Sequence, residues 1–316
     1  MRFGVTVAGN QSWRPFRVAL GHACIGVVGH DRPLWDSDRP GTLISESELT
    51  LTGVVIPCQL WHVTDGVRMQ YSELGQFHVS RDGSHIAFWF EQLCCQYADK
   101  VVERVLSTVV SVALQTRGAV CLHASSVVVD GGALAFMGDS GVGKSTVATR
   151  FLASGADVIA DDITPVAFSS GQPVALPFAP SLKLMPDIAE VWLEETELTG
   201  TYSMVFEKHI IAASKFGSRQ AEDASPLRGL FVLNREDSDV PASVRLEPLT
   251  GHRRASTLLA HSYLGTIIPS LGLGPAWMDQ IDALARTVPI VTLHYGNGLE
   301  ALVEAQRAIF EWLAQD

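Results

Sequence analysis

The sequence predicts an α/β protein in which a small β-rich module, residues 1–95, precedes a larger α/β domain, residues 118–316. Three observations predict this fold: strand-forming runs in the first range, a change to helical periodicity over 96–117, and a glycine-rich loop between an apolar run and a helix start. The length of 316 residues and the hydrophobic fraction of 47% allow one large domain or two ordinary ones with a buried core.

Charge and cysteine content limit the classes of partner. The net charge of -11 argues against a broad nucleic-acid or anionic-membrane surface, because those partners require clustered lysine and arginine. The first residues lack the apolar segment of a signal peptide, so we expect a cytoplasmic protein without a membrane span. The cysteines have no CxxC spacing, and we interpret all five as reduced thiols: Cys24, Cys58, Cys94, Cys95 and Cys121.

Strand and turn signals fill the first 95 residues. Apolar or alternating runs at 51–60, 76–80 and 85–90 predict strands, and Asp82-Gly83 predicts a hairpin turn between the last two. From Tyr97 to Arg117 apolar residues instead recur at helical spacing, and Gly118 is placed to end that helix. We expect this helix, within 96–117, to connect the module to the larger domain. Its first turns carry charged residues, which argues against a membrane span.

The segment 123–137 predicts two strands around the turn Asp130-Gly131-Gly132, the second leading directly into the glycine-rich loop. A helix is predicted from Ser145 to about Ser154, and Gly155 suits the left-handed position that ends it.

A short buried strand, 156–160, is then predicted to end at Asp161 and Asp162. Ligands of open α/β sheets bind at the carboxyl ends of strands. We therefore expect these two acids on the same side of the sheet as the loop.

The remaining chain continues in α/β style. A second hairpin is predicted from 164–168 and 173–177, and weak periodicity over 193–224 indicates a partly mobile excursion. The further elements expected are strands at 227–233 and 290–294 and helices near 252–264, 276–286 and 299–314.

The glycine-rich loop matches the pattern G-x-x-x-x-G-K-[S/T]. Glycines let backbone N–H groups approach closely spaced phosphate oxygens, and the following helix N-terminus adds a favourable partial charge. The pattern predicts that Lys144 contacts the β- and γ-phosphates of a nucleoside triphosphate and that the Ser145 hydroxyl binds Mg²⁺. The alternative is an ordinary glycine-rich turn. The predicted nucleotide-binding residues are Gly138, Asp139, Ser140, Gly141, Val142, Gly143, Lys144, Ser145 and Thr146.

The two neighbouring acids suggest a division of labour, because alternation points successive side chains in different directions. Asp162 is the candidate for the metal, and Asp161 is the candidate base that accepts the proton of an attacking hydroxyl. The alternative is that one of the pair only caps a turn. His123 begins the hairpin that leads into the loop, so its side chain can reach a phosphate; the alternative is a structural histidine.

Together, His123, the loop Gly138–Ser145 and the Ala-Asp-Asp sequence ending at Asp162 resemble the catalytic core of HPr kinase/phosphorylase, a family in the superfamily of phosphoenolpyruvate carboxykinase. The resemblance covers about 118–190. It implies a P-loop kinase core with a mixed sheet, ATP and Mg²⁺ as cofactors, and the following roles. Asp161 would be the base toward a protein serine, Asp162 would help hold Mg²⁺, and His123 would lie beside the transferred phosphate.

Two departures separate this chain from HPr kinases. Thr146 stands where they usually have Glu, with no RGLG-type segment after the acids, and residues 1–95 are unlike their N-terminal domain. The layout instead resembles HPr-kinase-related proteins encoded with peptide natural products, including lasso-peptide tailoring kinases that phosphorylate a precursor serine. The segments 122–125, 180–187 and 226–233 carry this resemblance. Lys183 and Arg228 become candidates to neutralise phosphate charge; the alternative for both is a solvated surface position.

The leading hypothesis is therefore an ATP- and Mg²⁺-dependent kinase that transfers the γ-phosphate to a serine of a peptide or small protein, with the β-rich module helping to recognise that substrate. One alternative is a small-molecule phosphotransferase, and another is a nucleotide-dependent switch or assembly factor without a phosphoacceptor. No nucleic-acid or membrane partner is expected. A homo-oligomer stays open.

Overall fold

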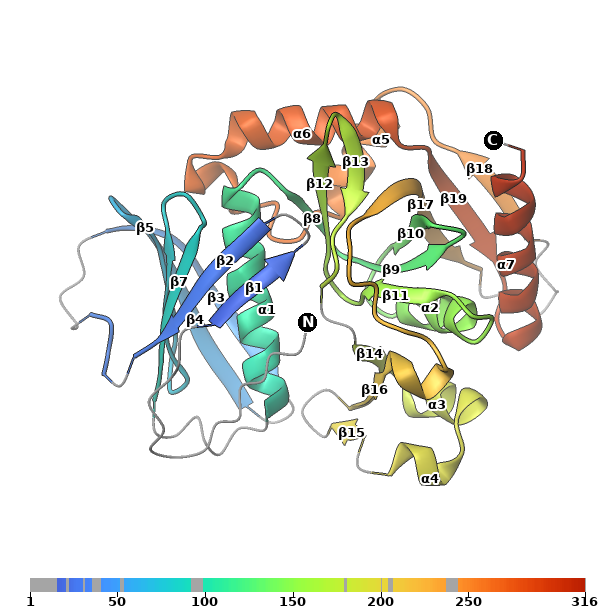
Figure 1. Cartoon of the computed structure of the whole chain (residues 1–316), viewed down its shortest axis with the longest axis horizontal. Helices are drawn as coiled ribbons and strands as arrows, with labels where there is room; N and C mark the ends of the chain where they lie inside the picture. Colours follow the sequence, from blue (N-terminus) through green and yellow to red (C-terminus); the bar gives the residue numbers. More distant parts are fainter. Residues whose placement is uncertain are drawn as a thin grey trace. The chain divides into compact units, whose positions relative to one another are not determined.

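The computed structural model describes residues 16–20, 23–30, 32–35, 41–51, 54–91, 99–178, 181–199, 201–203, 207–236 and 244–315. The chain divides into two compact units (Figure 1). The first contains Met1–Val120 with Ser203–Glu207 and Leu264–Met278, and the second contains Cys121–Tyr202, Lys208–Tyr263 and Asp279–Asp316. The ranges 1–95, 96–117 and 118–316 stay a prediction for the functional division of the chain.

The first unit contains a sheet whose strands, among the described residues, follow the order β1-β2-β7-β6-β5-β4-β3. The predicted turn at Asp82-Gly83 connects β6 to β7: the Asp82 carboxylate accepts hydrogen bonds from the hydroxyls of Ser80 and Ser84, and Gly83 has a φ of 65°. The strands are β1 Phe16–Leu20, β2 Ala23–Gly29, β3 Thr42–Leu51, β4 Val54–Val63, β5 Gly66–Tyr71, β6 Gly75–Ser80 and β7 His85–Phe90.

Helix α1, Asp99–Thr116, packs against β6 and β7 of this sheet. It confirms the predicted helix over its described part, since residues 92–98 lie outside the described residues. The described valines of this helix are buried, as are Phe77 and Phe88 of the strands that it packs against. The burial of large apolar side chains on both sides stabilises the unit. Cys58 and Cys121 are buried free thiols, whereas Cys94 and Cys95 lie outside the described residues.

The second unit is built on a mixed sheet, as predicted. Strand β17 pairs in parallel with β10 and β19, whereas β9 pairs antiparallel with β10 and β11. The strands of this sheet are β8 Val120–Leu122, β9 Ala124–Val129, β10 Gly132–Met137, β11 Asp157–Ala160, β12 Thr164–Ser169, β13 Gln172–Ala175, β17 Ser225–Arg235, β18 Arg245–Pro248 and β19 Ile290–Tyr295. Strand β18 is an element that the sequence pattern did not reveal.

Two tight turns form where the sequence predicts them. Between β9 and β10, Asp130 and Gly131 have φ values of 47° and 74°, and between β12 and β13, Ser170 and Gly171 have 50° and 79°. Positive φ at both central residues matches the right-handed twist of the paired strands, which is why short hairpins favour such turns.

Helices of the second unit pack against its large sheet. Helix α2, Lys144–Leu152, lies beside α7, Leu299–Leu313, and contacts β9 and β10 (Figure 1). Where α2 packs on β10, the rings of Phe151 and Phe136 lie 5.3 Å apart, and both are fully buried. The other helices are α3 Pro186–Trp192, α4 Glu195–Leu198, α5 His252–Ala260 and α6 Gly274–Thr287, whose first residues are grouped with the first unit. No described helix combines the length and apolarity that a bilayer span requires.

The range 193–224, predicted as a partly mobile excursion, contains regular secondary structure in its described residues. Strand β16, Lys208–Ala212, pairs antiparallel with β14, Ser181–Leu184, and buries Ile211 fully against it. A short third strand, β15 Tyr202–Ser203, completes this small sheet. The sequence pattern missed it because each strand is too short to show periodicity and the partner strand is distant along the chain.

Candidate functional site

The glycine-rich loop and the acidic pair emerge at the same edge of the large sheet. Strands β10 and β11 both pair antiparallel with β9, so they run in the same direction. The loop follows β10 and Asp161 follows β11 directly. This arrangement confirms the expected placement of the acids on the same side as the loop.

The loop adopts a backbone that only glycines accommodate readily. Gly138, Gly141 and Gly143 have φ values of 147°, 84° and 109°, a region that L-residues rarely adopt. A Cβ on Gly138 would also lie only 2.8 Å from a methyl carbon of Val142. Helix α2 starts at Lys144 without a side-chain cap at Gly143, so the N–H groups of its first turn point toward whatever the loop holds.

Lys144 lies across the loop. Its Nζ donates hydrogen bonds to the carbonyl oxygens of Gly138 at 2.8 Å and Asp139 at 3.0 Å. Burial lowers the pKa of Lys144; the carboxylate of Asp161 opposes this effect and the charge of Lys208 reinforces it. The side chain is 9% exposed, so an incoming anion would meet a desolvated ammonium group.

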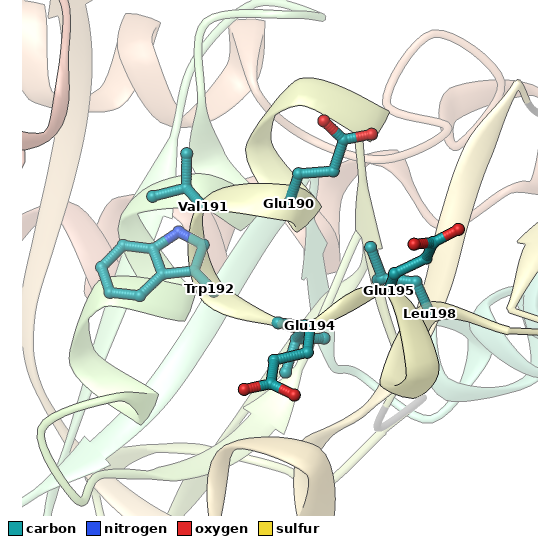
Figure 2. Close-up of a pocket in the computed structure, with 7 residues that line it drawn as sticks. Glu190, Val191, Trp192, Glu194, Glu195 and Leu198 are labelled. Atoms are coloured by element: carbon teal, nitrogen blue, oxygen red, sulfur yellow. The ribbon is translucent and has the colours of Figure 1, made fainter.

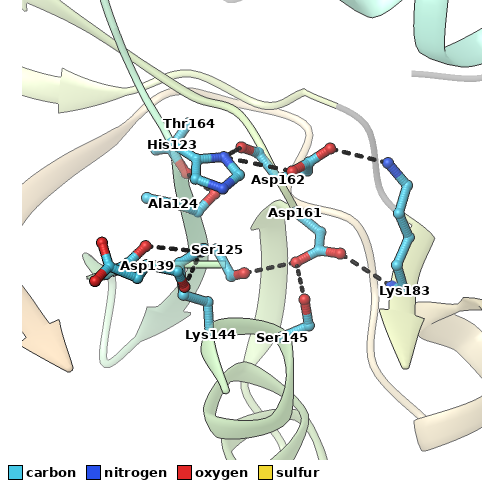
Figure 3. Close-up of polar contacts among 11 residues, drawn as sticks. His123, Ala124, Ser125, Asp139, Lys144, Ser145, Asp161, Asp162, Thr164 and Lys183 are labelled. Atoms are coloured by element: carbon cyan, nitrogen blue, oxygen red, sulfur yellow. Dashed lines mark hydrogen bonds and ion pairs between the residues drawn. The ribbon is translucent and has the colours of Figure 1, made fainter. Parts of the chain in front are cut away.

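Asp161 is buried beneath the loop and accepts a hydrogen bond from Ser145, the residue predicted to bind the metal (Figure 3). Its Oδ1 accepts hydrogen bonds from the hydroxyls of Ser125 at 2.6 Å and Ser145 at 2.8 Å, and its Oδ2 accepts one from the backbone N–H of Lys183 at 3.0 Å. A serine hydroxyl beside a carboxylate is a pair of hard oxygen donors, which suits Mg²⁺ when phosphate oxygens and water complete its shell. Among the described residues no group of three or more His, Cys, Asp or Glu could hold a metal ion by itself.

Asp162 points the other way, toward a cation and a histidine (Figure 3). Lys183 Nζ lies 3.0 Å from Asp162 Oδ2, and His123 Nδ1 lies 3.4 Å from Oδ1 and 2.9 Å from the backbone oxygen of Asp162. The Asp162 side chain is 19% exposed, whereas Asp161 is 3% exposed as a residue. A φ of 73° turns the backbone between the two acids, a left-handed conformation that costs about 1 kcal/mol or more outside glycine.

The small sheet brings cations to this cluster. Lys183 is the Cα partner of Ile210 on β16, so Lys208, two residues before Ile210, lies on the same face of the sheet as Lys183. Its charge also lowers the pKa of Lys144. The site therefore combines Lys144, Lys183 and Lys208 around the two aspartates.

Three contributors were absent from the sequence-based set. Ser125 reaches Asp161 from β9, and Tyr295 at the end of β19 donates a hydrogen bond to the carbonyl oxygen of Val142 at 2.6 Å. His261 follows α5, and its carbonyl oxygen accepts a hydrogen bond from the N–H of His123 at 2.7 Å. Burial lowers the pKa of His261, while Asp139 raises it and Lys144 lowers it further. Ser125 lies in the segment 122–125 noted for its resemblance, but no sequence pattern links these three residues to the site, because each contact joins distant parts of the chain.

Arg228 is not part of this cluster. Its side-chain carbons fill the space above Gly132, at the first residue of β10, whereas the loop follows the last residue of that strand. Strands β10 and β17 are parallel, so the early residues of β17 lie at the edge opposite the loop. This register places Arg228 away from the glycine-rich loop, so the expectation that it neutralises phosphate charge at the loop is wrong. Thr146, by contrast, lies half-buried in the first turn of α2.

A separate hollow of about 640 Å³ lies over α3 and α4 (Figure 2). None of the predicted site residues lines it. Its lining residues are Glu190, Val191, Trp192, Leu193, Glu194, Glu195 and Leu198.

Comparison with known proteins gives matches among solved structures but none among family models or curated proteins. No family model matches the sequence, and no curated protein matches it. Among solved structures, the Hpr(Ser) kinase/phosphatase from Coxiella burnetii aligns over 62% of this chain and 97% of that chain, with a TM-score of 0.34 and 13% sequence identity. The structural relationship is therefore distant.

Proposed function

We propose that the second unit is an ATP- and Mg²⁺-dependent kinase that transfers the γ-phosphate to a serine hydroxyl of a peptide or small protein. The observation that carries the proposal is the Ser145–Asp161 contact directly beneath the glycine-rich loop, with Asp162, Lys183 and His123 grouped beside it. Anion donors, a hard-oxygen pair and a second carboxylate are the parts that phosphoryl transfer needs.

The loop and Lys144 would bind the triphosphate. The loop backbone and the first turn of α2 supply N–H groups, and the desolvated ammonium of Lys144 supplies a positive charge next to them. Ser145 and Asp161 would hold Mg²⁺, which neutralises charge on the phosphate oxygens when it is bound.

The environments of the two aspartates favour an exchange of the roles predicted for them. Asp161 already accepts three hydrogen bonds and is buried against Ser145, which suits a metal-side carboxylate. Asp162 is more exposed and lies beside Lys183 and His123, which suits a base that must meet an acceptor from outside. In this proposal Asp162 accepts the proton of the serine hydroxyl. The serine oxygen forms the new bond to the γ-phosphorus, and the bond between that phosphorus and the ADP oxygen breaks.

The proposed acceptor is a peptide serine. A precursor peptide of a ribosomal natural product, such as a lasso peptide, follows from the resemblance noted in the sequence, and the β-rich first unit would help recognise it. A small-molecule acceptor, or a nucleotide-dependent switch with no acceptor, is the other outcome that the experiment below distinguishes.

The test is intact-mass analysis of a serine-containing precursor peptide after incubation with the protein, ATP and Mg²⁺. Wild-type protein should add one phosphate mass. Asp162→Asn should abolish transfer while binding of Mg·ATP, measured by calorimetry, is retained; Asp161→Asn should weaken Mg·ATP binding as well, because it removes a charge beside Ser145.

Asp157→Asn is the matched control, since Asp157 begins β11, the strand that leads to Asp161, and its carboxylate accepts a hydrogen bond from the backbone N–H of Arg219. It should behave as wild type. ATP consumption without peptide phosphorylation would shift the assignment to a small-molecule acceptor or a switch, and the absence of Mg·ATP binding by wild type would end the kinase proposal. Retained transfer by Asp162→Asn would return the role of base to Asp161.

A further inference from the structure

Tyr295 connects the glycine-rich loop to a strand that is distant in the sequence. Its hydroxyl donates a hydrogen bond of 2.6 Å to the carbonyl oxygen of Val142, in the middle of the loop. Tyr295 is the last residue of β19 and is 2% exposed, so its ring is fixed within the sheet edge. The neighbouring strand β17 also approaches the loop: a Cβ on Gly138 would lie 3.3 Å from the carbonyl oxygen of Leu233. The loop therefore rests on the carboxyl ends of two strands besides its own.

The contact with Tyr295 leaves no room for a different loop residue. A Cβ on Gly143 would lie 2.7 Å from the Tyr295 hydroxyl oxygen, closer than real Cβ contacts allow. Gly143 also has a φ of 109°, which is strained for any other residue. The Gly143 position is thus restricted both by its own backbone and by Tyr295.

The Tyr295 hydroxyl is suited to act as a permanent donor. Burial raises its pKa to about 12, and the charge of Arg235 lowers it only in part. Across the neutral pH range the phenol therefore keeps its proton and can donate the hydrogen bond to Val142.

We infer that Tyr295 is a positioning residue that holds the loop in its phosphate-binding shape before the nucleotide arrives. This inference rests on the proposed function of the loop. Backbone N–H groups bind phosphate well only when their directions are fixed in advance, since ordering them on binding costs conformational entropy. Tyr295 contributes this order from β19, which the sequence pattern of the loop does not include.

The first test is calorimetric binding of Mg·ATP to the full-length protein and to Tyr295→Phe, with phosphorylation of the precursor peptide measured at saturating ATP. Loss of one buried hydrogen bond should weaken ATP affinity about three- to tenfold, while the rate at saturation stays within about twofold. Tyr71→Phe is the matched control: Tyr71 is 5% exposed in the first unit, so it loses a buried hydroxyl without touching the loop.

The second measurement needs no activity. Hydrogen exchange of the nucleotide-free protein should be faster over residues 138–146 in Tyr295→Phe, with exchange in β17 and β19 unchanged. A third experiment combines two substitutions. Gly143→Ala should weaken ATP binding strongly. Adding Tyr295→Phe should not lower the ATP affinity further, because it removes the hydroxyl that the new methyl group would meet.

Each outcome bears on the inference. Unchanged ATP affinity and unchanged loop exchange in Tyr295→Phe would overturn it, as would a fall in the saturated rate with affinity intact. Failure of wild-type protein to bind Mg·ATP would overturn the proposed function instead, whereas faster loop exchange in Tyr295→Phe would still support the positioning role.

Discussion

At the scale of single residues, the site depends on how two successive aspartates are separated. Asp161 turns into the core beneath the loop and Asp162 turns outward, and the left-handed backbone of Asp162 produces that divergence. Aspartate tolerates this conformation better than most residues because its short side chain can form local hydrogen bonds. A strained residue at a charged cluster is consistent with a functional constraint on its position.

Lys144 should matter for function and little for stability. Lys144→Met keeps most of the side-chain volume and removes the charge. The variant loses two hydrogen bonds, which lowers stability, but it no longer has to bury a charged ammonium group, which raises stability. The free energy of unfolding should therefore change by less than about 1 kcal/mol. Affinity for Mg·ATP should fall at least about tenfold. Urea unfolding and calorimetry measure the two effects, and a large loss of stability with intact binding would contradict the prediction.

His261 should make the protein less stable in mild acid. Its folded-state pKa is lowered by burial below the ordinary value of 6.5, so the unfolded chain takes up a proton more readily. The contribution of His261 to stability is therefore present above about pH 6.5 and is lost as the pH falls below it. Urea unfolding at pH 7.5 and 5.5 should show a smaller decrease for His261→Asn than for wild type. A residual decrease is expected, since burial also lowers the pKa of His78.

At the scale of elements, the loop is held by packing beneath it. Phe151 of α2 packs in a buried cluster with Phe136. The ring of Phe310 on α7 lies 5.5 Å from the ring of Phe151. The helix that presents Lys144 and Ser145 is short, and short helices gain most of their stability from tertiary contacts. The position of the phosphate-binding groups therefore depends on these aromatic side chains.

Phe151→Ala should destabilise the second unit by about 3–5 kcal/mol, because it removes a fully buried ring and leaves a cavity. Phe310→Ala is the control on the other side of the same contact, and it should cost clearly less, since Phe310 is 38% exposed. Thermal and urea unfolding report the difference. Equal losses for the two variants would mean that the contact between α2 and α7 carries the stability, rather than the core beneath the loop.

At the scale of the whole molecule, the two units have separate cores, and the site residues described above all belong to the second unit. The first unit has its own aromatic cluster, in which half-buried Phe90 packs against buried Phe77 and Phe88. The net charge of -11 leaves the molecule without a general electrostatic attraction for nucleic acid. Lys144, Lys183 and Lys208 nevertheless place positive charges beside the two aspartates, where the proposed nucleotide would bind.

Binding of Mg·ATP should stabilise the second unit and leave the first nearly unchanged. A ligand that binds only the folded site adds about 2.7 kcal/mol at a concentration one hundred times its dissociation constant. Hydrogen exchange with and without Mg·ATP should therefore show added protection over 138–152 and β11, and little change over β4–β7. Equal protection of both units would show that nucleotide binding is coupled to the β-rich unit.

The sequence by itself determined the local chemistry. The glycine pattern, the hairpin turns and the helix start of the loop are local features, since they depend on backbone preferences and on residues a few positions apart, and the structure contains each of them. The sequence analysis also expected Asp161, Asp162, Lys183 and His123 near the loop, although it left open that one of the two acids only caps a turn, that His123 is structural and that Lys183 is solvated. Their proposed roles remain predictions.

Only the tertiary structure decided which distant groups join that site and which do not. Ser125, His261 and Tyr295 reach it through strand pairing and register, and the same register carries Arg228 to the opposite edge of the sheet. The small β14–β16 sheet was equally hidden, because its strands are too short to show a period and their partners lie far apart in the sequence. Long-range pairing brings groups together in space without leaving a local pattern, and this is why it had to be observed in the folded chain.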